Sequence, residues 1–121
     1  MKESKAILKN YRQSPRKVRL VIDAVRGKSV EKAITILSFI PKRSALPIQK
    51  LLASALANAK NLSVPVENLI IKEIKVDAGS TLQRRRHRSK GMINPIRKRI
   101  SHVSVTLAQS TSHKALKAKE K

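Results

Sequence analysis

The chain has 121 residues, of which 28 are lysine or arginine and 7 are aspartate or glutamate, so its net charge is +21. Its length suits one domain with a modest core. The electrostatic field of so high a positive charge requires a polyanionic partner, either a nucleic acid or an anionic membrane. Cysteine is absent, which excludes disulfides and cysteine-ligated zinc, and no apolar run approaches the about 18 residues of a membrane-spanning helix.

Aromatic side chains are nearly missing, since Tyr11 and Phe39 are the only Phe, Tyr or Trp residues. Proteins that hold single-stranded nucleic acid usually stack its bases on exposed rings. The composition therefore indicates that a nucleic-acid partner is recognised through its backbone and shape, as a structured molecule.

The N-terminal residues contain no apolar segment of the length that a signal peptide needs. We therefore expect the protein to act where it is made, or where a processed precursor delivers it. Residues 6–11 could form a short edge strand. The sequence patterns that follow this segment predict three helices and then two strands.

The first helix is predicted to begin at Ser14 and Pro15, because serine is a good N-cap and proline fits the first helical position. Gly27 is a natural stop. Four apolar residues fall on one face of this helix, namely Val18, Val21, Ile22 and Val25. Arg16 and Lys17 oppose the helix dipole, a local cost that favours contact with phosphate over a merely solvated face.

Serines also precede the next two helices. Ser29 is predicted to cap the second, which ends at Pro41, and Ser44 the third. The second helix has the apolar stripe Ala33, Ile34, Leu37 and Ile40. The third has the longest stripe in the sequence, namely Ile48, Leu51, Leu52, Ala55, Leu56 and Ala59.

Two strands follow, at residues 69–76 and 100–107. Alternation in the first predicts that Ile70, Ile74 and Val76 share one face, while Leu69, Ile71, Glu73 and Lys75 share the other. In the second, Val103, Val105 and Leu107 form the buried face. Helices followed by strands in blocks predict an α+β domain with a small antiparallel sheet.

The connection between these strands, residues 80–99, holds eight lysines and arginines and no acidic residue. We predict that it is the far end of a long β-hairpin arm, about 78–101, that enters a nucleic acid. The alternative is a disordered basic loop. The run lacks the Trp, Phe and Leu face of an interfacial helix, so we expect no membrane partner.

The arm is long relative to the body. About 14 residues at about 3.3 Å each would reach on the order of 45 Å, against a body radius of about 13 Å. Gly91 is the only glycine within residues 80–99 and is the candidate for the turn. Met92 and Ile93 would then lie near the tip, either as apolar contacts with a partner or packed incidentally between the arm strands.

Sequence motifs for catalysis are absent. The acidic residues are scattered without the spacing of a metal pair, and the histidines have no sequence-adjacent acid. The three glycines form no phosphate-binding loop. We therefore expect no enzyme activity, no metal site and no cofactor.

Four stretches together resemble the large-subunit ribosomal protein twenty-two family in its bacterial or organellar form. They are Ser14–Lys28, Leu51–Asn61, Ile74–Gly79 and Arg97–Val105, and the resemblance runs from about Asn10 to Ala108. It implies three helices on a small antiparallel sheet with a long hairpin. It also implies a structural role on large-subunit ribosomal RNA (rRNA), with the hairpin lining the nascent-peptide tunnel, and no catalytic role.

The resemblance also marks residues. Those that match the family's hairpin are Arg84, Arg85, Arg88, Lys90, Lys98, Arg99, Ser101 and His102, and those that match its basic first helix are Arg16, Lys17 and Arg19. We expect rRNA contact from these residues together with Arg12, Arg86, His87 and Arg97. The predicted tip is Ser89 to Ile93, where bacterial members commonly read P-R-A-x-G-R-A and this chain has His87, Ser89, Met92 and Ile93 as replacements.

The sequence therefore predicts one RNA-binding domain, residues 1–109, with a basic tail, residues 110–121. Expected partners are large-subunit rRNA, neighbouring large-subunit proteins and the nascent peptide, on a bacterial cytoplasmic or an organellar ribosome. No homo-oligomer is expected. The alternative is a histone-like DNA-architectural protein with a basic β-arm, although such proteins are usually dimers and each helix here has one apolar stripe only.

Overall fold

The structure, a computed structural model, describes residues 3–67 and 69–109. Strand β1 (Ser4–Tyr11) is followed by helices α1 (Pro15–Val25), α2 (Val30–Phe39) and α3 (Ala45–Asn61). Strands β2 (Leu69–Ala78), β3 (Leu82–His87), β4 (Ile93–Lys98) and β5 (Ser101–Gln109) complete the fold, with a single 3₁₀ turn (Ser89–Gly91) between β3 and β4. The predicted α+β class is confirmed, and the basic tail lies outside the described residues.

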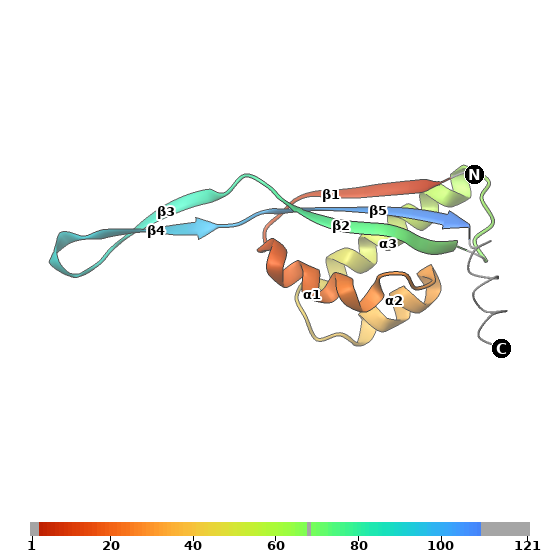
Figure 1. Cartoon of the computed structure of the whole chain (residues 1–121), viewed down its shortest axis with the longest axis horizontal. Coiled ribbons are helices and arrows are strands. Elements are labelled where there is room, and N and C mark those ends of the chain that lie inside the picture. The colour runs from red at the N-terminus through yellow and green to blue at the C-terminus, as the bar shows by residue number, and fades with distance from the viewer. Residues whose placement is uncertain (1–2, 68, 110–121) are drawn as a thin grey trace.

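The body is an antiparallel sheet of order β1-β5-β2 with the helices against one face (Figure 1). The edge strand predicted at residues 6–11 is confirmed, and it begins earlier, at Ser4. Strand β5 lies in the centre, and Val103, Val105 and Leu107 are buried as predicted. They pack into one core with the stripes of α1 and α3, which include Val18, Ile22, Ile48 and Leu52.

Two of the three predicted caps are present. The hydroxyl oxygens of Ser14 and Ser29 accept hydrogen bonds from the backbone N–H groups of Lys17 and Lys32. Ser44 precedes α3 as predicted, but its backbone already has helical angles (φ −77°, ψ −11°) and its buried hydroxyl makes no cap hydrogen bond. The chain begins α3 through a turn instead, in which the Ala45 N–H donates to the Lys42 carbonyl.

The face assignment of β2 also needs correction. Leu69, Ile71, Ile74 and Val76 are the buried residues, whereas Ile70 is only partly covered. A register shift separates Ile71, opposite Leu107, from Glu73, opposite Thr106. Lys72 is therefore an extra residue, a β-bulge that reverses the alternation. The bulge also directs Lys72 to Glu3, with which it forms an ion pair.

Strands β3 and β4 form a separate two-stranded ribbon that projects from the body as the predicted arm (Figure 1). Residues 80–99 are exposed except Ile96, which is half-buried. At the tip, the Arg88 N–H donates to the Met92 carbonyl. Gly91 has the predicted left-handed conformation (φ 71°), and so does Lys90 (φ 60°). Met92 and Ile93 are 64% and 49% exposed, so much of their apolar surface is open at the tip.

The base of the arm is held by polar contacts between distant segments. The Gly79 N–H donates to the Ile100 carbonyl at 2.7 Å. The imidazole of His102 lies against Gly79, and its Nδ1 accepts a hydrogen bond from the Asn10 N–H at 3.1 Å. Beside it, the Ser101 hydroxyl donates to the Gln13 carbonyl at 2.6 Å. These contacts restrain the direction in which the arm leaves the body.

Replacement of Leu82–Lys98 by an Asn-Gly turn should leave the body intact, because the deleted residues contribute almost nothing to the core. We expect the free energy of unfolding of the shortened chain to stay within about 0.5 kcal/mol of the parent, as for surface changes generally. Urea denaturation checks this. A decrease above about 2 kcal/mol would show that the arm stabilises the body.

Gly79→Ala should destabilise the arm base, because the new Cβ would lie 2.7 Å from the His102 Nε2 and 3.1 Å from the Ile100 Cγ2. Such overpacking typically costs about 1–3 kcal/mol. In a His102→Ala background the same change should cost less, since the nearest obstacle is gone. Equal costs in the two backgrounds would show that the close approach of His102 is not the cause.

Candidate nucleic-acid interface

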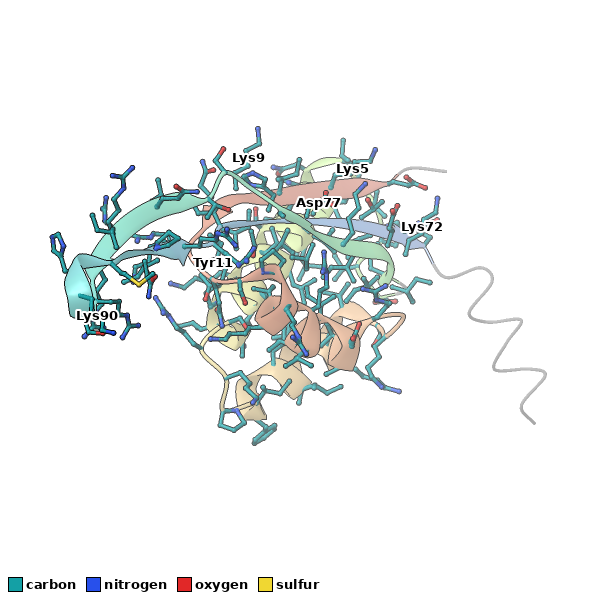
Figure 2. The ribbon with its side chains drawn as sticks, turned by 60° about the vertical axis from the view of Figure 1, so that its left-hand side comes forward. Lys5, Lys9, Tyr11, Lys72, Asp77 and Lys90 are labelled. Atoms are coloured by element: carbon teal, nitrogen blue, oxygen red, sulfur yellow. The ribbon has the colours of Figure 1, made fainter. Side chains whose placement is uncertain are left out.

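The arm is cationic on both of its faces. In the ribbon, Leu82 pairs with Lys98, Arg84 with Ile96 and Arg86 with Asn94. These pairs share one face, because side chains alternate along a strand. The other face carries Arg85 and His87 from β3 and Arg97 from β4. Side chains stand off both sides of the ribbon, with Lys90 at its end (Figure 2).

The distribution of cations over both faces of the arm restricts the shape of its partner. A ribbon that lay on one flat anionic surface would need cations on one face only. Guanidinium groups bind phosphate in bidentate fashion and stack on bases, and here they point in opposite directions. The arm is therefore suited to a partner that surrounds it, such as folded RNA with phosphates on several sides.

A second concentration of charge lies where the arm meets the body. An open pocket of about 620 Å³ is lined by Arg12, Gln13, Ser14, Lys17, Arg43, Arg97, Lys98 and Arg99. We call it the base pocket. Six of its eight lining residues are cationic and none is acidic. They come from three segments, namely the connection between β1 and α1 with the first turn of α1, the turn before α3, and the end of β4 with the residue after it.

Within residues 3–67 and 69–109, no carboxylate forms an ion pair with the cations of the base pocket. Within the part of the chain that the structure describes, the ion pairs are Arg26 with Asp23 and Lys72 with Glu3, and neither lines the pocket. The Lys72 ammonium lowers the pKa of Glu3, and Glu3 raises that of Lys72, through their hydrogen bond. Six cations that line one pocket repel one another, and a phosphate bound there would relieve that repulsion.

Sequence reasoning missed Arg43 as a site residue. It belongs to the short basic turn Pro41-Lys42-Arg43, far in the sequence from the arm. The sequence offers only an isolated pair of cations at this turn, and such pairs are common on protein surfaces. Only the fold brings Arg43 into one pocket with Lys17 and Arg97.

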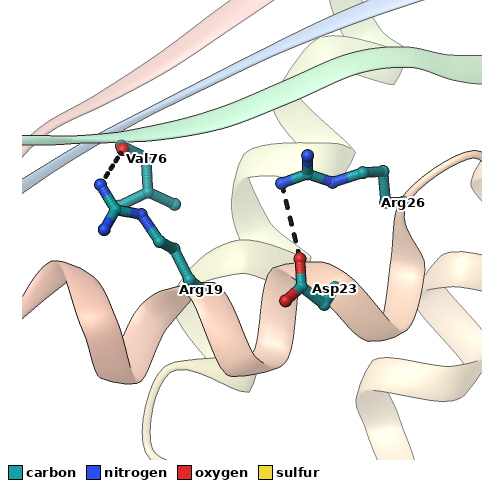
Figure 3. A network of polar contacts seen from close by, with 4 residues as sticks. All are labelled: Arg19, Asp23, Arg26 and Val76. Atoms are coloured by element: carbon teal, nitrogen blue, oxygen red, sulfur yellow. Dashed lines mark hydrogen bonds and ion pairs between the residues drawn. The ribbon is translucent and has the colours of Figure 1, made fainter.

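The first helix divides its basic residues between two tasks. Lys17 lines the base pocket, and Arg16 is exposed in the first turn. Arg19 is different, because its Nη2 donates a hydrogen bond to the Val76 carbonyl at 3.0 Å and so joins α1 to β2 (Figure 3). Further along the helix, Arg26 pairs with Asp23 at 3.6 Å (Figure 3).

Two residues predicted to contact RNA also hold the arm base. Ser101 is fully buried, and its hydroxyl donates to the Gln13 carbonyl, so its side chain is not exposed at the surface of the body. His102 is half-buried, with Nδ1 engaged by the Asn10 N–H and the ring against Gly79. The alternation that puts Val103 in the core also puts Ser101 there.

Residues 3–67 and 69–109 contain no group of three His, Cys, Asp or Glu side chains that could hold a metal ion. Among the helices that the structure describes, none is long and apolar enough to cross a membrane.

Comparison with known proteins gives a consistent result. The sequence model of the family described as ribosomal protein L22p/L17e matches residues 6–108. The chain is also 47% identical, over 110 residues, to proteins from two strains of Desulfitobacterium hafniense, each named large ribosomal subunit protein uL22. The aligned part covers 90% of this chain and 96% of each relative.

A comparison of Arg19→Ala with Arg16→Ala should show whether the Arg19 hydrogen bond, and not its charge, stabilises the fold. Removal of the bond to the Val76 carbonyl should lower the free energy of unfolding by about 1 kcal/mol. The Arg16 variant, with the same change in charge on the same helix, should stay within about 0.5 kcal/mol. Equal decreases in urea denaturation would show that the Arg19 hydrogen bond contributes nothing to the fold.

Proposed function

Because the chain belongs to the ribosomal protein L22p/L17e family, we propose that it binds large-subunit rRNA through its arm and base pocket and so supports folding of that RNA and subunit assembly. The family makes the chain a structural protein of the large ribosomal subunit. The observation that carries the proposal is the cationic surface, which runs from the base pocket at Arg97–Arg99 along both faces of the arm.

The arm's shape supports a more specific role. A two-stranded ribbon is thin and carries cations in opposite directions, so it can pass between RNA helices that would exclude a globular domain. Isolated ribbons of this kind are marginal in water, so RNA on both faces would fix its shape. We infer that the arm lines the nascent-peptide tunnel, as the family resemblance implies.

The tip in this proposal is Ser89 to Ile93. Lys90 and Gly91 turn the chain, and Met92 and Ile93 expose apolar surface at the end of a cationic ribbon. Apolar groups that face a passing peptide avoid holding it by charge. The nascent peptide would therefore touch the tip transiently, whereas the RNA would be bound permanently.

The relatives' bacterial source supports a place on a bacterial ribosome in the cytoplasm, with an organellar ribosome as the alternative. Neighbouring large-subunit proteins are further expected partners. We expect neither catalysis nor a cofactor, and no homo-oligomer, because copies of a chain with a charge of +21 repel one another.

Sedimentation of a tagged copy from cell lysate tests the assignment. Migration with the large ribosomal subunit should survive a high-salt wash, because an arm enclosed by folded RNA can leave only if that RNA rearranges, whereas binding by surface charge alone weakens steeply with salt. Release from ribosomes with retention on chromosomal DNA would contradict the proposal and support the histone-like alternative.

Replacement of Arg84, Arg85, Arg86 and Arg88 by alanine should weaken binding to a large-subunit rRNA fragment and leave the body folded. The plot of log affinity against log salt should flatten by about 0.7–0.9 for each phosphate that the variant no longer neutralises. Fluorescence titrations at several salt concentrations measure this slope.

The matched control replaces four exposed cations of the body, namely Arg26, Lys28, Lys32 and Lys60. This variant has the same net charge as the arm variant. A slope that falls equally in both variants would mean that overall charge, and not the arm, determines binding.

A further inference from the structure

A groove at the free edge of β1 differs in chemistry from the base pocket. It is lined by Ile7, Leu8, Leu46, Pro47, Lys50, Leu51 and Ser54, has a volume of about 400 Å³, and we call it the edge groove. Five of its seven lining residues are apolar and one is charged. Ile7 and Leu46 are 59% and 58% exposed, whereas Leu51 is buried and forms the floor.

The backbone beside the groove is available for pairing. Strand β1 is an edge of the sheet order β1-β5-β2, with β5 on one side only. The Lys5 carbonyl accepts a hydrogen bond from the Asn58 side chain at 2.9 Å, so it points away from β5 toward α3. Peptide groups two residues apart point the same way, which directs those of Ile7 outward as well.

No comparable contact covers Ile7. The hydrogen bonds of the described residues that lie outside the strand ladders include none to its N–H or carbonyl. Asn58 therefore closes the edge at Lys5 and leaves it open at Ile7, next to the apolar floor. An exposed edge beside an apolar hollow is the arrangement that accepts an added strand from a partner.

The charge around the groove selects the kind of partner. Lys50 lines it, and Lys5 and Lys9 flank Ile7 along the strand, all three exposed. Figure 2 shows Lys5 and Lys9 on the β1 side of the body, away from the arm tip at Lys90. An apolar floor favours an apolar side chain over RNA, which would present charged phosphates and polar sugars to it. A second copy of this chain would meet like charge.

We propose that the edge groove binds an extended segment of another protein. That segment pairs with the outward peptide groups of Ile7, places an apolar side chain against Leu46 and Leu51, and carries acidic residues opposite Lys5, Lys9 and Lys50. This interaction does not depend on RNA binding by the arm, and either proposal can fail without the other.

The test uses the full chain and a labelled, acetylated nonapeptide of alternating glutamate and valine with a central leucine. Fluorescence anisotropy at about 0.3 M salt suppresses attraction that is purely long-range. Leu46→Lys should weaken binding at least about tenfold, since it removes an apolar contact at the centre of the site. Leu20→Lys on α1 is the matched control, because Leu20 is also a helical residue and is 64% exposed. This substitution adds the same charge as Leu46→Lys.

A second comparison tests strand pairing. The same peptide N-methylated at every backbone amide keeps its charges and side chains but has no N–H to donate from either edge, and it should bind about tenfold more weakly, because it cannot complete the hydrogen bonds to β1. Amide NMR signals of Ile7, Leu8 and Leu51 should shift on addition of the unmodified peptide.

Four outcomes would overturn the proposal. Equal weakening by the two leucine variants would mean that the peptide is held by overall charge. Equal binding of the two peptides would exclude pairing with β1. NMR shifts at Arg97–Arg99 instead of Ile7 would show that the peptide binds at the base pocket. Shifts at Ile7 with a short RNA duplex but not with the peptide would show that the edge groove binds RNA and not a protein segment.

Discussion

Positive charge without matching negative charge is the constraint on which the rest of this structure depends. Residues 80–99 hold eight lysines and arginines and no acid, and the ribbon displays them on both faces. Like charges on strands about 4.8 Å apart repel, and an isolated ribbon has no core to offset that repulsion. The arm is therefore built to be completed by an external polyanion, and the body has to supply the order at its base.

The body supplies that order through a small polar junction rather than through apolar packing. Asn10, Gln13, Gly79, Ser101 and His102 come from three parts of the chain and meet where the arm leaves the sheet. The absence of a side chain at Gly79 lets the His102 ring approach its backbone closely. These contacts thus fix the orientation of the arm relative to the body, while the far end of the arm stays exposed. Such an arm is oriented before a partner binds it.

The body also separates two kinds of surface by chemistry. The base pocket gathers six cations, whereas the edge groove has an apolar floor and a free strand edge. Both border the start of α3, since Arg43 precedes that helix and Leu46 lies in its first turn. The same helix start can therefore face a phosphate on one side and an apolar side chain on the other, with different dependence on salt.

The sequence by itself determined the features that rest on neighbours in the chain. Caps at Ser14 and Ser29, the stripe of α3, the alternation of β5 and the left-handed Gly91 follow from contacts within a few residues. Tertiary structure alone decided the rest. The bulge at Lys72 exchanges the roles of Ile70 and Ile71, Ser101 is bound to a residue 88 positions away, Arg19 joins α1 to β2, and Arg43 reaches the base pocket. Local periodicity contains no information about such partners, because they meet only when the sheet and helices pack.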